Sequence, residues 1–175
     1  MNIVLIGYRC SGKTEVGKTL ATELGRDFLD IDALIEKNTG DPIQQIVSGK
    51  GWDHFREIEK RLVAEISRKD HLVVATGGGF VMDEENVQNL KKNGWLVWLN
   101  AGCDVLRHRM VKDSESGRAR PSLTGANPLE EIKEVLTIRK PLYERAADFM
   151  VDTGILSIGE VAAAIIKALP KGLQG

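Results

Sequence analysis

One eight-residue segment constrains this chain more than any other: residues 7–14 read Gly-Tyr-Arg-Cys-Ser-Gly-Lys-Thr. The pattern G-x-x-x-x-G-K-[ST] is typical of a loop that cradles phosphates. The apolar run at residues 2–6 predicts a buried strand before it, and apolar residues at helical spacing over residues 13–24 predict a helix after it. This order would direct several backbone N–H groups at one anion. An ordinary strand-to-helix turn that matches the pattern by chance is the alternative.

Every residue of this loop is a candidate nucleotide contact. We expect Lys13 to place a positive charge on the β- and γ-phosphates and the Thr14 hydroxyl to ligate Mg²⁺. The remaining candidates are Gly7, Tyr8, Arg9, Cys10, Ser11 and Gly12. Cys10 is also expected to be a reactive thiol, because a helix N-terminus favours the thiolate. A small and inert filler is the alternative for that cysteine.

Length and composition narrow the class of protein. The 175 residues predict a single domain over residues 1–175, and 42% hydrophobic residues are enough for a core. A net charge of −1 does not favour nucleic acid as a partner. Two cysteines without metal-binding spacing are expected to be free thiols in a reducing cytosol. The first apolar run is too short for a signal peptide or a membrane span. We therefore expect a cytoplasmic monomer with no membrane partner.

Apolar runs alternate with helical patterns along the whole chain. After the first strand, further strands are expected at residues 27–31, 71–76, 95–99 and 148–151. Helices are expected at residues 13–24, 33–37, 52–68, 83–92, 103–111 and 128–147, and a last helix, with Ser157 as its cap, is expected to end at Leu169. Another helix should restart after Asp41, the expected N-cap, and Pro141 should kink or divide the long helix. The alternation predicts an α/β fold with a parallel sheet and helices on both faces.

Ligands of such sheets bind beyond the carboxyl ends of the strands. The phosphate-binding loop, the Asp30/Asp32 pair and the run Gly77, Gly78 and Gly79 all follow predicted strands, so we expect them to line one crevice. Both carboxylates should lean to one face of their strand. One can hold Mg²⁺, usually through water, and the other an acceptor hydroxyl. Alternatively, Asp32 caps a helix that starts at Ala33, and the two roles can coexist.

The three glycines would bring backbone N–H groups close to a ligand, and a flexible turn is the alternative. Arg56, one turn before Glu59, and Arg139 suit bidentate capture of a carboxylate or phosphate. The alternative is that both are solvated surface charges or members of i,i+3 pairs, which is the commoner role of an arginine judged by residue type alone.

The polar segment at residues 112–125 predicts a mobile basic lid, which Arg107 and Arg109 precede. Such a lid excludes water and brings an arginine, here Arg118 or Arg120, to a transferring phosphoryl group. A loose surface loop is the alternative.

Taken in order, these motifs resemble the shikimate kinases, a family related to the nucleoside-monophosphate kinases. The resemblance covers nearly the whole chain and is carried by residues 7–14, 29–32, 55–59, 77–79, 120–121 and 139–143. It implies a three-layer P-loop kinase fold with strand order 2-3-1-4-5 and a lid. It also implies transfer of the ATP γ-phosphate to the 3-hydroxyl of shikimate.

The resemblance implies a role for each motif. On the nucleotide side, Lys13 and Thr14 would handle the ATP phosphates and Mg²⁺, and Asp30 would hold Mg²⁺ through water. Arg109 would stack on adenine and Arg120 would close over the phosphates. On the acceptor side, Asp32 would bind shikimate hydroxyls and assist deprotonation of the attacking one. Arg56 and Arg139 would clamp the shikimate carboxylate. Phe55 and Glu59 would line the substrate pocket, and Gly77, Gly78 and Gly79 would supply backbone contacts.

The chain departs from the family pattern at three points. Cys10 replaces the usual glycine of the phosphate-binding loop, Ser122 replaces a usual leucine after the lid arginine, and the lid is longer. A gluconate kinase of the same fold is the nearest rival, since gluconate is also a carboxylate with hydroxyls. A nucleotide-dependent regulatory module without turnover is the second rival. The intact Lys13, Thr14 and Asp30, with Arg120, argue against that module.

Overall fold

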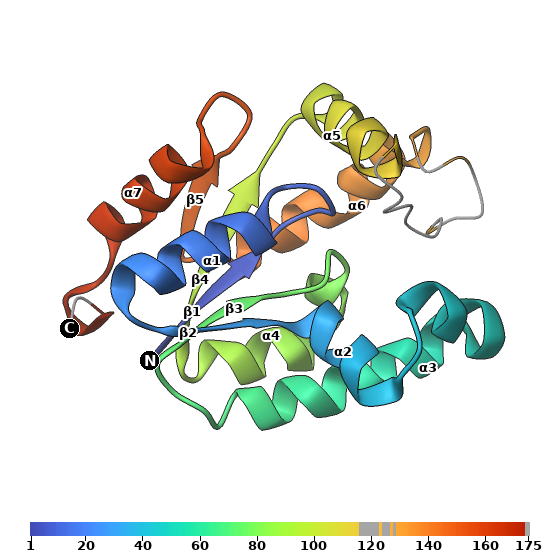
Figure 1. Cartoon of the computed structure of the whole chain (residues 1–175), viewed down its shortest axis with the longest axis horizontal. Coiled ribbons are helices and arrows are strands. Elements are labelled where there is room, and N and C mark those ends of the chain that lie inside the picture. The colour runs from blue at the N-terminus through green and yellow to red at the C-terminus, as the bar shows by residue number, and fades with distance from the viewer. Residues whose placement is uncertain (116–122, 124–126, 128, 174–175) are drawn as a thin grey trace.

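A five-stranded parallel sheet organises the computed structural model, which describes residues 1–115, 123, 127 and 129–173 (Figure 1). The strand order is β2-β3-β1-β4-β5, which confirms the order that the resemblance implied. The strands are β1 Asn2–Ile6, β2 Asp27–Asp30, β3 Leu72–Ala75, β4 Gly94–Asn100 and β5 Phe149–Asp152. β1 and β3 are buried along their whole length, as expected of central strands with helices on both faces.

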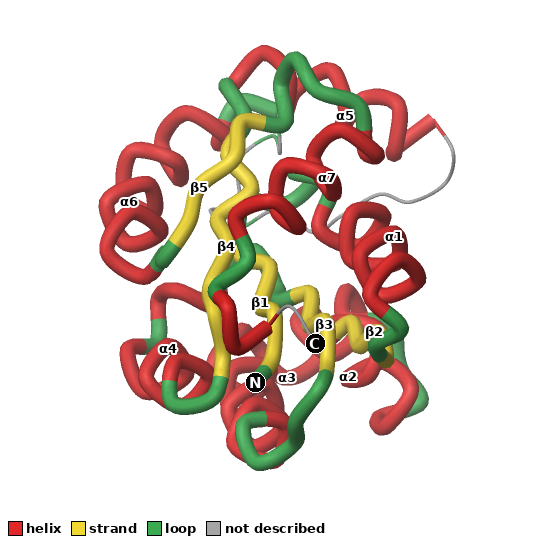
Figure 2. The backbone as a smooth tube through the Cα atoms, turned by 90° about the vertical axis from the view of Figure 1, so that its left-hand side faces the viewer, coloured by secondary structure: helices red, strands yellow, loops and turns green. Residues whose placement is uncertain are grey.

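Helices cover both faces of the sheet, so the fold has three layers (Figure 2). Along β1, side chains alternate between two cores: Ile3 and Leu5 pack on one face, and Val4 and Ile6 on the other. The first face is covered by α1 Lys13–Leu24 and α7 Ile158–Ala168. The second is covered by α2 Ile31–Thr39, α3 Ile43–Ile66, α4 Glu84–Lys91 and α6 Glu131–Ala146.

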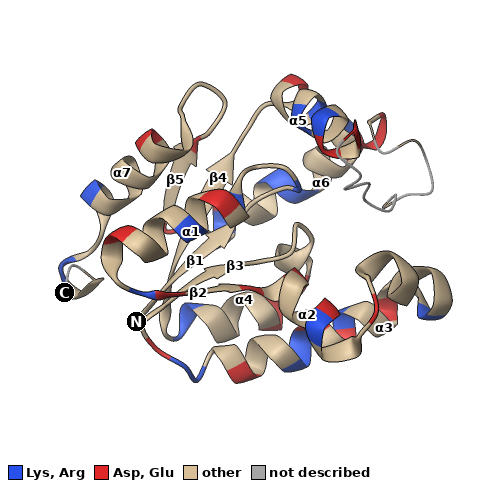
Figure 3. Cartoon of the chain, in the orientation of Figure 1, with Lys and Arg blue, Asp and Glu red and all other residues tan. Residues whose placement is uncertain are grey.

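A third, smaller core lies between α6 and α5 Cys103–Glu115. It joins Tyr8 of the phosphate-binding loop to Leu106 and Met110 of α5 and to Ile132 of α6. Short 3₁₀ helices, η1 Phe80–Met82 and η2 Lys171–Leu173, complete the fold. Acidic and basic residues are interspersed along the helices (Figure 3). No helix in the described ranges has the length and apolar character that crossing a membrane requires.

The predicted N-cap of α3 is wrong for an identifiable reason. Asp41 is not an N-cap: α3 begins at Ile43 after Pro42, and the Ile43 N–H donates to Glu36 Oε1 at 2.9 Å. A side chain of the preceding helix therefore caps α3. The backbone of α3 breaks from helical geometry at Gly51, with φ 83° and ψ 170°, so its two parts correspond to the helix predicted after Asp41 and the helix predicted from Trp52.

Pro141 does not divide α6, which is one helix from Glu131 to Ala146. The proline removes one backbone hydrogen bond, but the residues after it are fixed by packing. Tyr143 is buried and its ring stacks on Trp98 at 5.8 Å between centroids, so the last turn is held by the core.

The lid predicted at residues 112–125 is partly wrong. Residues 112–115 belong to α5, whose helical pattern continues beyond the predicted end at 111. Arg118 and Arg120 lie outside the described residues, so the structure places neither. Leu123 is described and packs against the third core.

Candidate active site

The phosphate-binding loop connects β1 to α1, as its motif predicted. Lys13 folds back over the loop, and its Nζ donates to the carbonyl oxygens of Gly7 and Tyr8 at 2.8 Å each. Gly7 has a φ of 146°, and a Cβ there would lie 2.6 Å from the Leu99 carbonyl oxygen. Gly12 has a φ of 99° at the N-cap of α1. Both glycines therefore occupy positions that other residues fit poorly.

Asp30, rather than Asp32, caps α2. The helix begins at Ile31, so Asp30 is its N-cap, and Oδ1 accepts from the Ala33 N–H at 3.2 Å. The other carboxylate oxygen accepts from the Thr14 hydroxyl at 2.7 Å. Because the strand ends one residue earlier than predicted, Asp32 lies in the first turn of the helix and not on the strand. The capping alternative for Asp32 is wrong, and the two aspartates have separate surroundings.

An arginine–glutamate pair stands on α3. Arg56 Nη1 lies 2.6 Å from Glu59 Oε2, and the Glu59 side chain is fully buried. Burial raises the pKa of Glu59, and the Arg56 guanidinium offsets part of that rise. The guanidinium also lies over the rings of Phe55 and Trp52, 5.1 and 5.6 Å from their centroids. Arg56 is thereby held in one place by charge and by aromatic faces.

The three glycines after β3 make room for charged side chains. None has a positive φ, so backbone freedom is not the reason for them. A Cβ on Gly77 would lie 2.8 Å from Asp32 Oδ1 and 2.9 Å from Glu59 Oε1, and one on Gly79 would collide with Arg56 Nη2. On Gly78 a Cβ would lie 3.0 Å from the Arg9 backbone nitrogen. The glycines let α2, α3 and the phosphate-binding loop converge on one point.

Arg139 reaches the same point from α6. Its Nη1 donates to the Gly78 carbonyl oxygen at 3.0 Å, and the Tyr143 hydroxyl donates to that oxygen too. Burial raises the pKa of Tyr143, which therefore keeps its proton and remains a donor. Arg56 and Arg139 thus approach the glycine turn from helices that are distant in the sequence, as two cations beside the carboxylates of Asp32 and Glu59.

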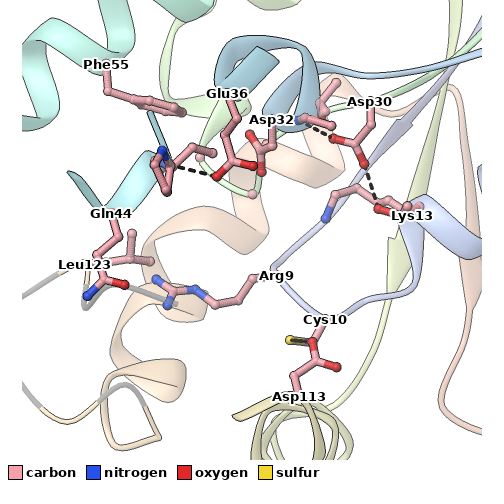
Figure 4. A pocket seen from close by; sticks show the side chains of 18 of the residues that line it. Arg9, Cys10, Lys13, Asp30, Asp32, Glu36, Gln44, Phe55, Asp113 and Leu123 are labelled. Atoms are coloured by element: carbon pink, nitrogen blue, oxygen red, sulfur yellow. Dashed lines mark hydrogen bonds between the residues drawn. The ribbon is translucent and has the colours of Figure 1, made fainter. Parts of the chain in front are cut away.

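One cavity of about 760 Å³ joins the loop to this cluster (Figure 4). Predicted site residues that line it are Arg9, Cys10, Gly12, Lys13, Thr14, Asp30, Asp32, Phe55, Arg56, Gly77, Gly78, Gly79, Arg109 and Arg139. Gly7, Tyr8, Ser11 and Glu59 lie behind its wall. The sequence analysis missed several further lining residues, among them Glu36, Gln44 and Trp52. Of these three, only Trp52 had a signal, its position one helical turn before Arg56.

Arg109 and Cys10 border the cavity near α5. The Arg109 guanidinium donates to the carbonyl and hydroxyl oxygens of Thr153, which follows β5, at 2.5 and 3.0 Å. Cys10 has a φ of 62°, and its Sγ lies 3.4 Å from Asp113 Oδ2. The Cys10 thiol therefore has a carboxylate partner on α5, which the sequence of the loop did not predict.

The described residues contain no group of three or more histidine, cysteine or acidic side chains that could hold a metal ion. The hydroxyl of Thr14 and the carboxylate of Asp30 lie side by side at the end of the loop, 2.7 Å apart. Oxygen donors of this kind suit Mg²⁺, which keeps several waters and takes one or two protein ligands beside phosphates.

Comparison with known proteins agrees with this geometry. A family model described as shikimate kinase matches residues 9–170. The shikimate kinase of Thermodesulfovibrio yellowstonii is 47% identical over 95% of this chain and 93% of its own, and that of Syntrophus aciditrophicus is 40% identical over 95% and 89%.

Solved structures agree as well. Shikimate kinase from Acinetobacter baumannii in complex with shikimate is 36% identical, with a TM-score of 0.87 over 95% of this chain and 90% of that one. Shikimate kinase from Aquifex aeolicus is 32% identical, with a TM-score of 0.79 over 95% of each chain. By its sequence, its fold and the layout of its cavity, this chain belongs to the shikimate kinase family.

Proposed function

We propose that this protein transfers the γ-phosphoryl group of ATP to the 3-hydroxyl of shikimate, giving shikimate 3-phosphate and ADP. One observation carries the proposal: a single cavity joins a phosphate-binding loop to two arginines and two carboxylates around a glycine turn. The loop suits a nucleoside triphosphate. The charged side chains around the glycine turn suit a small acceptor that carries one carboxylate and several hydroxyls.

The acceptor would lie against the glycine turn. Arg56 and Arg139 would bind its carboxylate, and Asp32, which lines the same cavity beside Gly77, would face its hydroxyls. Asp32 would accept a hydrogen bond from the attacking hydroxyl and take its proton as the bond to phosphorus forms. Phe55 and Glu59 would support Arg56 from behind, and Gly78 and Gly79 would offer backbone contacts.

The nucleotide would lie over the loop. Lys13 would exchange its two loop carbonyl partners for the β- and γ-phosphate oxygens, where charge develops during transfer. Arg109 would lie beside the adenine, and Arg120 would contact the transferring group. Thr14 and Asp30 would hold Mg²⁺, with Asp30 acting through water. When bound, Mg²⁺ neutralises negative charge on the phosphates.

Further parts of the proposal concern the whole protein. We propose a single domain that acts as a monomer in the cytoplasm, on two small-molecule substrates, with no nucleic-acid or membrane partner. Light scattering of the purified protein and fractionation of the source cells would test its size and location.

An ADP-release assay with three arms tests the activity: shikimate, gluconate and no acceptor. We expect ADP release with shikimate alone. Release with gluconate would favour the rival kinase of the same fold, and no release beyond the acceptor-free rate would favour a regulatory module.

Arg139→Ala serves as the matched variant, because it removes one charged partner of the shikimate carboxylate, worth about 1.5–3 kcal/mol. It should raise the shikimate KM by tenfold or more and leave the ATP KM nearly unchanged.

A further inference from the structure

A buried ion pair joins the phosphate-binding loop to the first turn of α6. Arg9 Nη2 lies 3.2 Å from Glu131 Oε1, and the two side chains are only 7% and 0% exposed. The position of Arg9 is one of the four unspecified positions of the loop motif, so phosphate binding does not require an arginine there. Burying both charges is costly unless the remaining polar atoms are also satisfied. The cost of burying this pair indicates that Arg9 or Glu131 makes a further contact.

Glu131 makes a further contact, with the backbone of Leu123. Both of its carboxylate oxygens accept from the Leu123 backbone N–H, at 2.9 and 3.1 Å. The Leu123 side chain packs against the third core, which includes Tyr8 of the loop and Met110 of α5. Arg9 extends from the loop toward Leu123 across the cavity (Figure 4). One carboxylate thus connects the loop, Leu123 and the start of α6.

These three segments carry residues of the reaction. Arg9 lies in the loop that also carries Lys13, and α6 carries Arg139 about two turns beyond Glu131. In the sequence, Leu123 follows Arg120 by three residues. A carboxylate in the first turn of a helix is further favoured by the helix dipole, which gives Glu131 a fixed site on a rigid element.

We propose that Glu131 is a positioning residue for phosphoryl transfer, which acts through Arg9 and Leu123 and does not touch either substrate. It sets the position of Leu123 relative to the phosphate-binding loop. The rival explanation is that the pair only stabilises the start of α6. The two explanations differ in what happens when both charges are removed together, because stability can then recover without the hydrogen bonds to Leu123.

The experiment compares Glu131→Gln, Arg9→Met and the double variant Arg9→Met/Glu131→Leu. The control is Glu134→Gln, an exposed glutamate in the same first turn of α6. For each, kcat, both KM values and the Tm are measured. Glu131→Gln should lower kcat at least tenfold, change the shikimate KM less than twofold and lower the Tm, because Arg9 is left without its buried partner. The control should match the wild type.

The double variant separates positioning from stability. It should regain most of the Tm that Glu131→Gln loses and should keep the low kcat. Its loss of kcat should be no larger than that of the worse single variant, because both act through one carboxylate. A double variant with wild-type kcat would overturn the proposal, as would Glu131→Gln with kcat within twofold of the wild type, or losses in kcat that multiply.

Hydrogen exchange at the Leu123 amide gives a readout that does not depend on activity. In the wild type this N–H has a carboxylate acceptor, so it should exchange at least tenfold more slowly than in Arg9→Met/Glu131→Leu. It should be unaffected by Glu134→Gln. Equal exchange rates in all variants would contradict the contact through which Glu131 is proposed to act.

Discussion

Lys13 is held by the loop that it is proposed to serve. Its ammonium group satisfies two loop carbonyls, so a phosphate can replace these partners without moving the helix that carries the lysine. Lys13→Ala should abolish turnover, since a charge that stabilises the transition state is lost while few apolar contacts are removed. The measurement is kcat of a variant with native circular dichroism. More than about a tenth of wild-type activity, a loss below about 1.4 kcal/mol, would contradict the role.

Asp32 can be tested cleanly because it does not cap α2. Asp32→Asn should lower kcat by about a hundredfold or more, since the amide cannot take the proton of the attacking hydroxyl. The Tm should remain within a degree or two, because the cap belongs to Asp30. Asp53→Asn, an exposed change on α3, is the control. Near-normal turnover in Asp32→Asn would exclude Asp32 as the proton acceptor.

Glu59 should give stability a dependence on pH. Burial raises its pKa in the folded protein above the value in the unfolded chain. Such a group favours folding most when the pH is below the unfolded pKa, about 4.3, and this contribution is lost as the pH rises through the folded pKa. The Glu59→Gln variant has no carboxyl group that can titrate at this position. The Tm of the wild type minus that of Glu59→Gln should therefore fall as the pH rises from about 4 to 7. A difference that rises over this range would contradict the direction.

Among the elements, the glycine turn after β3 leaves the room that the Arg56 side chain occupies in the site. A Cβ on Gly79 would meet the guanidinium end of Arg56, which pairs with the buried Glu59. Gly79→Ala should therefore displace Arg56, raise the shikimate KM about tenfold and lower the Tm, because Glu59 loses its charged partner. Gly159→Ala is the control, because a Cβ there meets open space within α7. It should stabilise the protein by about 0.5–1 kcal/mol and leave the KM unchanged. An unchanged KM in Gly79→Ala would contradict this account of the turn.

Elements with a strong local signal could be predicted from the sequence. The loop, the alternation of strands and helices, and the Ser157 cap of α7 each depend on a few neighbouring residues, and all three are present. The choice between Asp30 and Asp32 as cap could not be predicted, since both residue types cap equally well and the strand end differed by one residue. The Glu36 cap of α3 and the Arg9–Glu131 pair join distant residues, and no local pattern marks such contacts.

At the scale of the whole molecule, the two halves of the cavity belong to different layers. The phosphate-binding loop leads into α1 on one face of the sheet, whereas Arg56 and Arg139 stand on α3 and α6 on the other face. They meet at the carboxyl ends of β1, β2 and β3, where parallel sheets bind their ligands. The architecture thus brings a nucleotide and an acceptor together from opposite sides of one sheet edge.

The most direct test of the account is the position of the phosphoryl group in the product. The protein is incubated with ATP, Mg²⁺ and shikimate, and ³¹P–¹H correlation spectra identify the proton coupled to the new phosphorus. We predict one ADP formed for each phosphoester, with the phosphorus coupled to the proton on carbon 3, and no product with Lys13→Ala. A phosphoester at another carbon, or ADP and free phosphate without a shikimate ester, would contradict the account.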